Sequence, residues 1–155
     1  MIVTKEICDF EEKSKICGTI LRALPSWFNI ESGIADYIKQ VKTMPFYVAF
    51  DENKPIGFVA IKIHNPFTAE IYVMGILEEY HRKGIGKNLI NICETFCVDR
   101  KIEFLIVKTL DESAESEGYK KTRLFYQSLG FKPLEVFPAF WDESNPCLLM
   151  VKSTI

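Results

Sequence analysis

The sequence from Thr68 to Arg100 decides the fold: it reads TAEIYVMGIL, then EEYH, then RKGIGK, then NLINICETFCVDR. Residues 68–77 have the alternating pattern of a strand, and residues 86–100 carry apolar side chains at the spacing of a helix. A short turn and a glycine-containing loop join them. Because the first backbone N–H groups of a helix have no partner within it, they can bind an anion. The stretch therefore predicts a strand, a loop and a helix, in that order.

The composition of the loop supports two interpretations. Gly84 and Gly86 let the backbone approach a ligand closely, and three basic side chains add positive charge, namely Arg82, Lys83 and Lys87. The first interpretation is a loop that binds phosphate groups. The second is a basic helix start with flexible glycines. This interpretation stays open because short glycine motifs often occur by chance, without a phosphate-binding function. The loop alone does not decide between them.

Length and composition indicate one globular domain over residues 1–155. A chain of 155 residues is long enough to bury a core, and 48% hydrophobic with 26% charged residues is the mix of a soluble protein. The net charge of -2 gives no reason to expect a nucleic-acid partner, because proteins that bind nucleic acids carry a basic surplus. It mildly favours a cationic or neutral substrate.

The cysteines and histidines argue against a disulfide framework and against a metal site. The five cysteines are irregularly spaced and form no Cys-x-x-Cys pair, and the only histidines are His64 and His81. No apolar run reaches the length of a membrane span, and the first residues lack the pattern of a signal peptide. We therefore expect reduced thiols in a cytoplasmic protein that has no membrane partner.

The other elements follow from periodicity and turn residues. We expect strands at 1–8, 46–50, 56–64, 102–107, 131–137 and 147–152, and helices at 9–24, 30–42 and 118–129. Strands 46–50 and 56–64 should form a hairpin with a turn of four to five residues, strand 102–107 should be buried on both faces, and residues 138–146 should form a loop. The result is a mixed α/β fold: a mostly antiparallel sheet with one βαβ unit, flanked by about four helices.

Two residues of strand 68–77 are candidates for function. Glu70 either serves as a base for a substrate proton or lies on a half-exposed face of the sheet. Gly75 weakens the strand and indicates a bulge or a close backbone approach. A ligand with its phosphates on residues 82–87 could then run its tail along residues 74–76.

Outside this stretch the chemical signals are weaker. Tyr126 either packs in the core or donates its phenolic proton to a leaving group. No cysteine stands out as a nucleophile, and His64 is expected at the surface. The acidic run at 111–117 is interpreted as a solvated surface, with attraction of a cationic substrate as the second hypothesis. Four aromatic residues either line a substrate groove or belong to the core: Trp27, Phe28, Phe140 and Trp141.

Two ordered motifs give the chain a resemblance to the GNAT N-acetyltransferase superfamily over most of its length. The family has Gln/Arg-x-x-Gly-x-Gly/Ala after its fourth strand, and this sequence has His81-Arg-Lys-Gly84-Ile-Gly86 there. The family also has an aromatic residue and Tyr followed shortly by Gly-Phe, which Phe125-Tyr126 and Gly130-Phe131 match. His81 departs from the usual Gln or Arg, so a side-chain contact to the pyrophosphate is lost or passes to Arg82.

The resemblance implies an acetyl-CoA-dependent N-acetyltransferase. The N–H groups of the loop would hold the pyrophosphate, which places Arg82, Lys83, Gly84, Ile85, Gly86 and Lys87 in the cofactor site. Met74, Gly75 and Ile76 would pair with the pantetheine arm, and an N–H near Met74 would polarise the acyl carbonyl. No metal is implied.

The resemblance also implies roles for Tyr126 and Glu70. Tyr126 would protonate the departing CoA thiolate, and Glu70 matches the glutamate that acts as base in the histone-acetyltransferase branch. Glu70 and Met74 are separated by roughly 13 Å of strand, which favours a proton relay through water. Tyr72, on the same face as Glu70 and nearer to Met74, is a candidate for the lining of the acceptor pocket.

Several alternatives stay open at the level of sequence. The acceptor is a primary amine of a small molecule or a peptide, attacked directly in a ternary complex. The alternative function is a non-catalytic module of the same fold that binds and senses acyl-CoA. A nucleotide-binding domain is poorly supported, because no Gly-x-Gly-x-x-Gly or Walker motif occurs. Pairing of two chains into a homodimer through the terminal strands is a further alternative.

Overall fold

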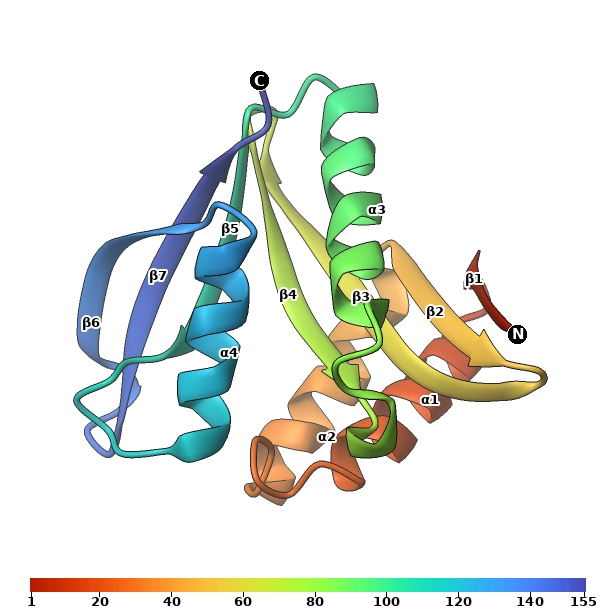
Figure 1. The fold of residues 1–155 in the computed structure, drawn as a ribbon, viewed down its shortest axis with the longest axis horizontal. Helices are drawn as coiled ribbons and strands as arrows, with labels where there is room; N and C mark the ends of the chain where they lie inside the picture. Colours follow the sequence, from red (N-terminus) through yellow and green to blue (C-terminus); the bar gives the residue numbers. More distant parts are fainter. The chain divides into compact units, whose positions relative to one another are not determined.

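The computed structural model describes residues 1–155 and has the predicted mixed α/β fold (Figure 1). The elements are β1 (Ile2–Glu6), α1 (Phe10–Arg22), α2 (Glu31–Gln40), η1 (Val41–Thr43), β2 (Phe46–Asp51), β3 (Lys54–Asn65), β4 (Thr68–Ile76), η2 (Glu78–Tyr80), α3 (Ile85–Asp99), β5 (Phe104–Leu110), α4 (Glu117–Ser128), β6 (Lys132–Asp142) and β7 (Asn145–Ser153). The strand order is β1-β2-β3-β4-β5-β7-β6. No helix is both long and apolar enough to cross a membrane.

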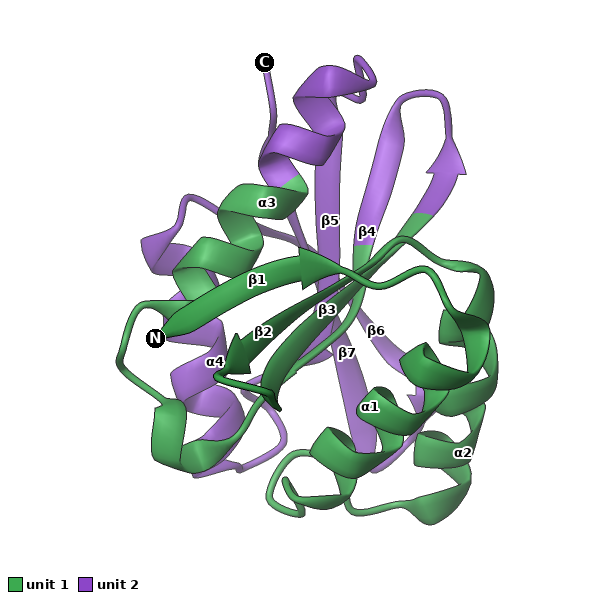
Figure 2. Ribbon diagram, turned by 90° about the vertical axis from the view of Figure 1, so that its right-hand side faces the viewer, with its two compact units in different colours: residues 1–62, 71–93 green, residues 63–70, 94–155 purple.

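The chain divides into two compact units, which Figure 2 colours separately. Unit 1 comprises Met1–Lys62 and Ile71–Cys93, and unit 2 comprises Ile63–Glu70 and Glu94–Ile155. Strands β3 and β4 and helix α3 each continue from one unit into the other. Each unit has its own strands, helices and buried side chains.

Unit 1 contains an antiparallel meander of strands together with the helices α1 and α2. Val3 of β1 pairs with Phe50 of β2, and Phe46 of β2 pairs with Ala60 of β3. Asp9 caps α1, because its carboxylate accepts a hydrogen bond from the Glu12 N–H at 2.9 Å. Helices α1 and α2 lie side by side in this unit (Figure 2).

The core of unit 1 is aromatic and aliphatic. Phe46 and Phe58 are fully buried and stacked, with ring centroids 5.1 Å apart. The charged side chain of Lys13 is also buried, and its ammonium donates to the backbone carbonyls of Met44 at 2.7 Å and Lys42 at 3.3 Å. These bonds offset the cost of removing the charge from water.

Unit 2 contains a second antiparallel ladder in which β7 lies between β5 and β6. Leu105 of β5 pairs with Lys152 of β7, and Lys132 of β6 pairs with Val151. Ser116 caps helix α4, because its hydroxyl accepts a hydrogen bond from the Tyr119 N–H. Arg123 of α4 donates to the carbonyl oxygen of Leu110 at 2.7 Å, which ties the helix to the end of β5.

Three sequence predictions about strands were wrong in detail. Residues 138–146 are not a loop, because β6 continues to Asp142 and β7 begins at Asn145. Pro138 is tolerated since β6 is the last strand of the sheet and its pairing with β7 is irregular after Phe137. The hairpin turn before β3 has two residues instead of four to five, because Asp51 pairs with Lys54.

The third error concerns the fifth strand. It spans Phe104–Leu110 instead of residues 102–107, and it is not buried on both faces. Leu105 and Val107 are buried, whereas Phe104 is exposed and Lys108 is half-buried. The continuous apolar run 102–107 hid this alternation, because the polar residue of the less buried face comes only at Lys108.

The burial of four of the five cysteines predicts their reactivity. Cys8 is exposed, and the others are buried. Burial raises the pKa of Cys17 to about 12 and the pKa values of Cys97 and Cys147 to about 11. Since the thiolate is the reactive form, we expect a disulfide reagent at mildly alkaline pH to modify only Cys8 quickly in the folded protein.

The measurement is a count of modified thiols by mass spectrometry, before and after unfolding in guanidinium. Unfolding should make all five cysteines reactive. Rapid modification of Cys147 in the folded protein would contradict the packing of β7.

Candidate active site

The glycine loop in unit 1 has a backbone shape that exposes N–H groups. Arg82 and Gly84 both adopt left-handed conformations, with φ of 61° and 79°. The first helical hydrogen bond of α3 joins the Asn88 N–H to the Gly84 carbonyl at 3.0 Å. The N–H groups of residues 85–87 therefore have no acceptor within the helix. A side chain on Gly84 would meet no atom within 4 Å, so the space in front of the loop is open to a ligand.

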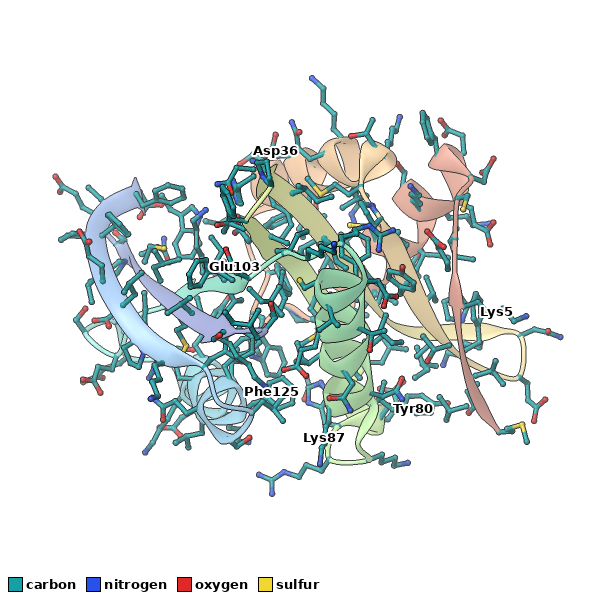
Figure 3. All side chains as sticks on the ribbon, turned by 90° about the horizontal axis from the view of Figure 1, so that it is seen from above. Lys5, Asp36, Tyr80, Lys87, Glu103 and Phe125 are labelled. Atoms are coloured by element: carbon teal, nitrogen blue, oxygen red, sulfur yellow. The ribbon has the colours of Figure 1, made fainter.

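A hollow of about 640 Å³ opens beside this loop within unit 1. Its lining residues are Ile2, Thr4, Asp51, Tyr80, Lys83, Gly84, Ile85, Asn88 and Ile92. Tyr80 donates a hydrogen bond to the Asp51 carboxylate at 2.6 Å, which raises the pKa of the phenol. Figure 3 labels Tyr80 and Lys87 at the same end of α3.

His81 connects the loop to its surroundings in unit 1. Its Nε2 lies 2.6 Å from the carbonyl oxygen of Ile76, and its ring packs edge-on against Trp27 with centroids 5.5 Å apart. A carbonyl oxygen only accepts hydrogen bonds, so Nε2 carries the proton. The residue at the usual Gln or Arg position thus anchors the loop to the last residue of β4 and to the segment between α1 and α2.

Gly75 marks a close approach, as one of its two sequence interpretations expected. A Cβ at this position would lie 3.1 Å from Ile20, 3.2 Å from Leu24 and 3.3 Å from Leu21. Helix α1 therefore packs directly on the backbone of β4 at the place where the resemblance puts the pantetheine arm. Met74 and Ile76, on either side, are half-buried.

Aromatic rings from three segments meet in unit 1. Phe28 contacts Tyr37 of α2 at 6.0 Å between centroids, and Tyr37 contacts Tyr72 of β4 at 5.4 Å, both edge-on. The ammonium of Lys62 lies 5.7 Å from the Tyr72 ring. Because the three rings are half-buried, each ring packs partly against the protein and is partly accessible to solvent.

Glu70 begins a charged cluster that lies within unit 2. Its side chain is almost completely buried, so the interpretation of a half-exposed position was wrong. Its Oε1 lies 2.6 Å from Nε2 of His64 and 3.2 Å from Nζ of Lys108, and its Oε2 lies 3.4 Å from the same ammonium. Lys108 also lies 4.9 Å from the centroid of the Phe140 ring. The carboxylate is therefore compensated by two donors.

The sequence prediction missed both partners of Glu70. Lys108 is 38 residues away in the chain, and no local pattern connects the two. His64 was expected at the surface and is exposed there, but its contact with Glu70 was not predicted. The hairpin register contained the signal for that contact. Asn65 turns the chain by accepting from the Phe67 N–H at 2.8 Å, which brings the end of β3 back beside the start of β4.

Tyr126 is buried near the end of α4 in unit 2. Its ring contacts Phe125 at 5.3 Å and Phe131 at 5.5 Å, both edge-on. Its backbone carbonyl accepts from the N–H groups of Leu129 and Phe131 at 3.1 Å, which ends the helix, and Gly130 follows with φ of 95°. The local geometry thus explains why Tyr126 and the Gly130-Phe131 pair occur together.

The acidic run after β5 is mainly a solvated surface, as its first interpretation held. Glu112, Glu115 and Glu117 are exposed. Asp111 accepts hydrogen bonds from the Ser113 hydroxyl and backbone N–H, and the bond from the hydroxyl is the main cause that lowers its pKa. Its carboxylate therefore shapes the turn after β5.

Comparison with protein families decides what kind of domain carries this loop. A family model described as an acetyltransferase (GNAT) domain matches residues 42–133, which is more than half of the chain. The chain belongs to the GNAT acetyltransferase family. An uncharacterized N-acetyltransferase from Chlorobaculum tepidum is 29% identical to this GNAT protein over 105 residues, which cover 66% of the chain and 61% of that relative. The match therefore spans about three fifths of the relative's length.

Solved structures agree on the fold of this GNAT protein. The ribosomal-protein-S18-alanine N-acetyltransferase from Escherichia coli superposes with a TM-score of 0.77 at 13% identity, over 99% of this chain and 94% of that one. An aminoglycoside 6'-N-acetyltransferase complexed with coenzyme A gives 0.77 at 18% identity, over 99% and 97% of the two chains.

The two units divide the predicted site residues of the GNAT protein between them. Residues 74–76 and 82–87 all lie in unit 1, the former at the end of β4 and the latter in the loop and first turn of α3. Glu70 and Tyr126 lie in unit 2, on β4 and α4. The residues predicted to bind the cofactor thus lie in one unit, and the two residues predicted to transfer protons lie in the other.

A pair of glycine substitutions tests the loop geometry. Gly84 and Gly33 both have open space around a new Cβ, but only Gly84 has a positive φ. We expect Gly84→Ala to lower the free energy of unfolding by about 1 kcal/mol, since alanine resists the left-handed conformation. Gly33→Ala, in helix α2, should raise it by roughly 0.5–1 kcal/mol.

The measurement for both variants is equilibrium unfolding in guanidinium. Gly33→Ala serves as the matched control, because the side chain added is the same. Equal effects of the two substitutions would mean that Gly84 does not need its left-handed backbone.

Proposed function

We propose that this protein is an acetyl-CoA-dependent N-acetyltransferase. It transfers the acetyl group to a primary amine by direct attack in a ternary complex. The observation that carries the proposal is the loop before α3, in which Arg82 and Gly84 take left-handed conformations and leave the first N–H groups of the helix open. Free backbone donors at a helix start are suited to a pyrophosphate. The coenzyme A complex of a protein with the same fold supports the choice of thioester.

The proposed acetyl-CoA site follows the chain from the end of β4 to the first turn of α3. The N–H groups of residues 82–87 hold the pyrophosphate, with Arg82, Lys83 and Lys87 supplying positive charge. Residues 74–76 take the pantetheine arm, and the N–H near Met74 stabilises negative charge on the acyl oxygen. His81 contributes indirectly, because its bond to Ile76 fixes the loop against β4.

The proposed proton transfers involve Tyr126 and the cluster around Glu70. Tyr126 gives its phenolic proton to the CoA thiolate as the C–S bond breaks. The Glu70 cluster accepts a proton from the incoming amine. At neutral pH the amine is mostly protonated, and it must lose that proton before it can attack. The reaction as proposed needs no metal.

The proposed acceptor is a small molecule or a peptide with a primary amine. The half-buried rings of Phe28, Tyr37 and Tyr72 offer an apolar surface with negative ring faces, which suits an alkyl ammonium group. The names of the fold neighbours include both a small-molecule acceptor and a protein acceptor. The free cysteines favour a reducing compartment such as the cytoplasm.

The second candidate function is a non-catalytic module that binds acyl-CoA. The observation that favours it is the engagement of His81 with the Ile76 carbonyl, because the usual side-chain contact to the pyrophosphate is then missing. Binding without transfer to any amine would support this alternative.

Calorimetric titration with acetyl-CoA tests the proposed binding site. We expect micromolar affinity and no comparable binding of ATP. Gly84→Glu should abolish binding, because it puts a negative charge in the open space in front of the loop. Gly33→Glu is the matched control and should bind normally, since Gly33 lies in α2. Absence of binding by the folded wild-type protein would refute the proposal.

Tyr126→Phe tests the proposed acid. The substitution removes only the hydroxyl, and the ring contacts to Phe125 and Phe131 should persist. We expect kcat to fall by about 10²-fold, a typical value for loss of an acid catalyst, with the affinity for acetyl-CoA unchanged. The measurement is steady-state transfer to the best amine of a panel. Wild-type turnover in the variant would exclude Tyr126 as the acid.

A further inference from the structure

The last strand of the sheet leaves several large apolar side chains uncovered. β6 belongs to unit 2, where it pairs with β7 on one side and with no strand on the other (Figure 1). Every residue of β6 except Phe137 is exposed. Four of the exposed side chains are large and apolar: Leu134 at 62%, Val136 at 41%, Phe140 at 55% and Trp141 at 42%. An apolar strand at the open edge of a sheet is suited to association with another chain.

The second half of β6 also departs from regular pairing with β7. Between the paired residues Phe137 and Asp142, the four residues 138–141 stand against a single residue of β7. Such a bulge leaves part of the backbone outside the ladder. The rings of Phe140 and Trp141 contact each other at 5.9 Å between centroids, and both are exposed. These two aromatic residues are therefore not part of the core, which was one of their two interpretations.

Two prolines restrict which strand can pair with β6. Pro133 and Pro138 have no N–H to donate, so a second strand would gain few backbone hydrogen bonds beside them. A strand of arbitrary sequence relies on those bonds when it joins a sheet edge. The partner of β6 must therefore match its side chains.

The charges of β6 match those of a second copy that runs antiparallel. A twofold axis through Phe137 puts Lys132 opposite Asp142 of the partner subunit. Because the axis repeats every contact, two such pairs of opposite charge form, one at each end of the strands. A shift of two residues would instead put Lys132 opposite Phe140 of the partner subunit and remove both pairs.

The apolar residues match in the same register. Leu134 comes opposite Phe140 of the partner subunit, and Pro133 comes opposite Trp141 of the partner subunit. Residues opposite each other in antiparallel strands have their side chains on the same face, where they can pack. The exposed apolar side chains therefore cover one another between the two charged ends.

We propose that this protein forms a twofold dimer in which two copies of β6 pair antiparallel about Phe137. The partner is a second copy of this chain, and the pairing does not depend on the proposed acetyl transfer. Each subunit uses the same strand edge for the contact. Association through this edge therefore ends at the dimer.

Analytical ultracentrifugation of the wild-type protein tests the dimer. We expect a monomer–dimer equilibrium with a Kd on the order of 10 µM, because one strand per subunit makes a small interface. A protein that stays monomeric up to its limit of solubility would overturn the proposal.

Charge reversal tests the register. Lys132→Glu puts like charges opposite each other at both ends of the dimer and should weaken it by at least about tenfold. Asp142→Lys should have the same effect. An equimolar mixture of the two variants should regain the wild-type affinity, since both contacts of the mixed dimer join opposite charges. Lys132 and Asp142 are the ends of an 11-residue strand, roughly 30 Å apart, so the recovery cannot arise within one chain.

A second variant avoids the turn between β6 and β7, in which Asp142 accepts a hydrogen bond from the Ser144 N–H. Leu134→Ser removes an exposed apolar side chain, so the fold should persist while the dimer weakens by at least about tenfold. Leu124→Ser is the matched control, because Leu124 is similarly exposed on α4. Lys121→Glu, also on α4, is the control for the change in net charge.

The variants decide between this contact and any other. Wild-type affinity in Leu134→Ser or in Lys132→Glu would overturn the proposal, and so would equal weakening by the two control variants. A mixture of folded Lys132→Glu and Asp142→Lys that does not regain affinity would overturn the antiparallel register about Phe137.

Discussion

The structure of unit 2 depends on the burial of one carboxylate, that of Glu70. Burying an ionised group costs several kcal/mol unless donors replace the lost water. Glu70 obtains them from His64 and Lys108, so the ends of β3, β4 and β5 must meet with one particular register. A shift of a single residue in β3 would turn His64 to the other face of the sheet. The same charge thus fixes how these strand segments meet.

Much of the fold could be predicted from sequence because its signals are local. Asp9 caps α1, Gly130 follows α4, and apolar periodicity located every helix to within a few residues. The errors arose where a local signal was overruled by position in the sheet. Pro138 indicated a loop, but β6 is the last strand, where a missing N–H leaves no partner unsatisfied.

For the candidate site, the sequence predicted one part and missed another. The loop residues 82–87 follow one another in the chain, so a single motif identified them, and the structure adds the conformations of Arg82 and Gly84. The partners of Glu70 depend on contacts across strands. No pattern in a sequence read alone pairs Glu70 with Lys108, whereas the tight turn at Asn65 contained the information for His64. The sequence therefore predicted the glycine loop better than the contacts around Glu70.

The position of Lys13 has a consequence for the chemical lifetime of the protein. A thioester acetylates exposed lysine amines slowly without any enzyme, and a protein that binds such a thioester keeps its own lysines near it. Lys13 is buried, and its ammonium is held by the Met44 and Lys42 carbonyls. Its burial and these two hydrogen bonds keep the nitrogen away from a thioester in solution. The lysine whose modification would damage the core of unit 1 is thus protected against the protein's own proposed substrate.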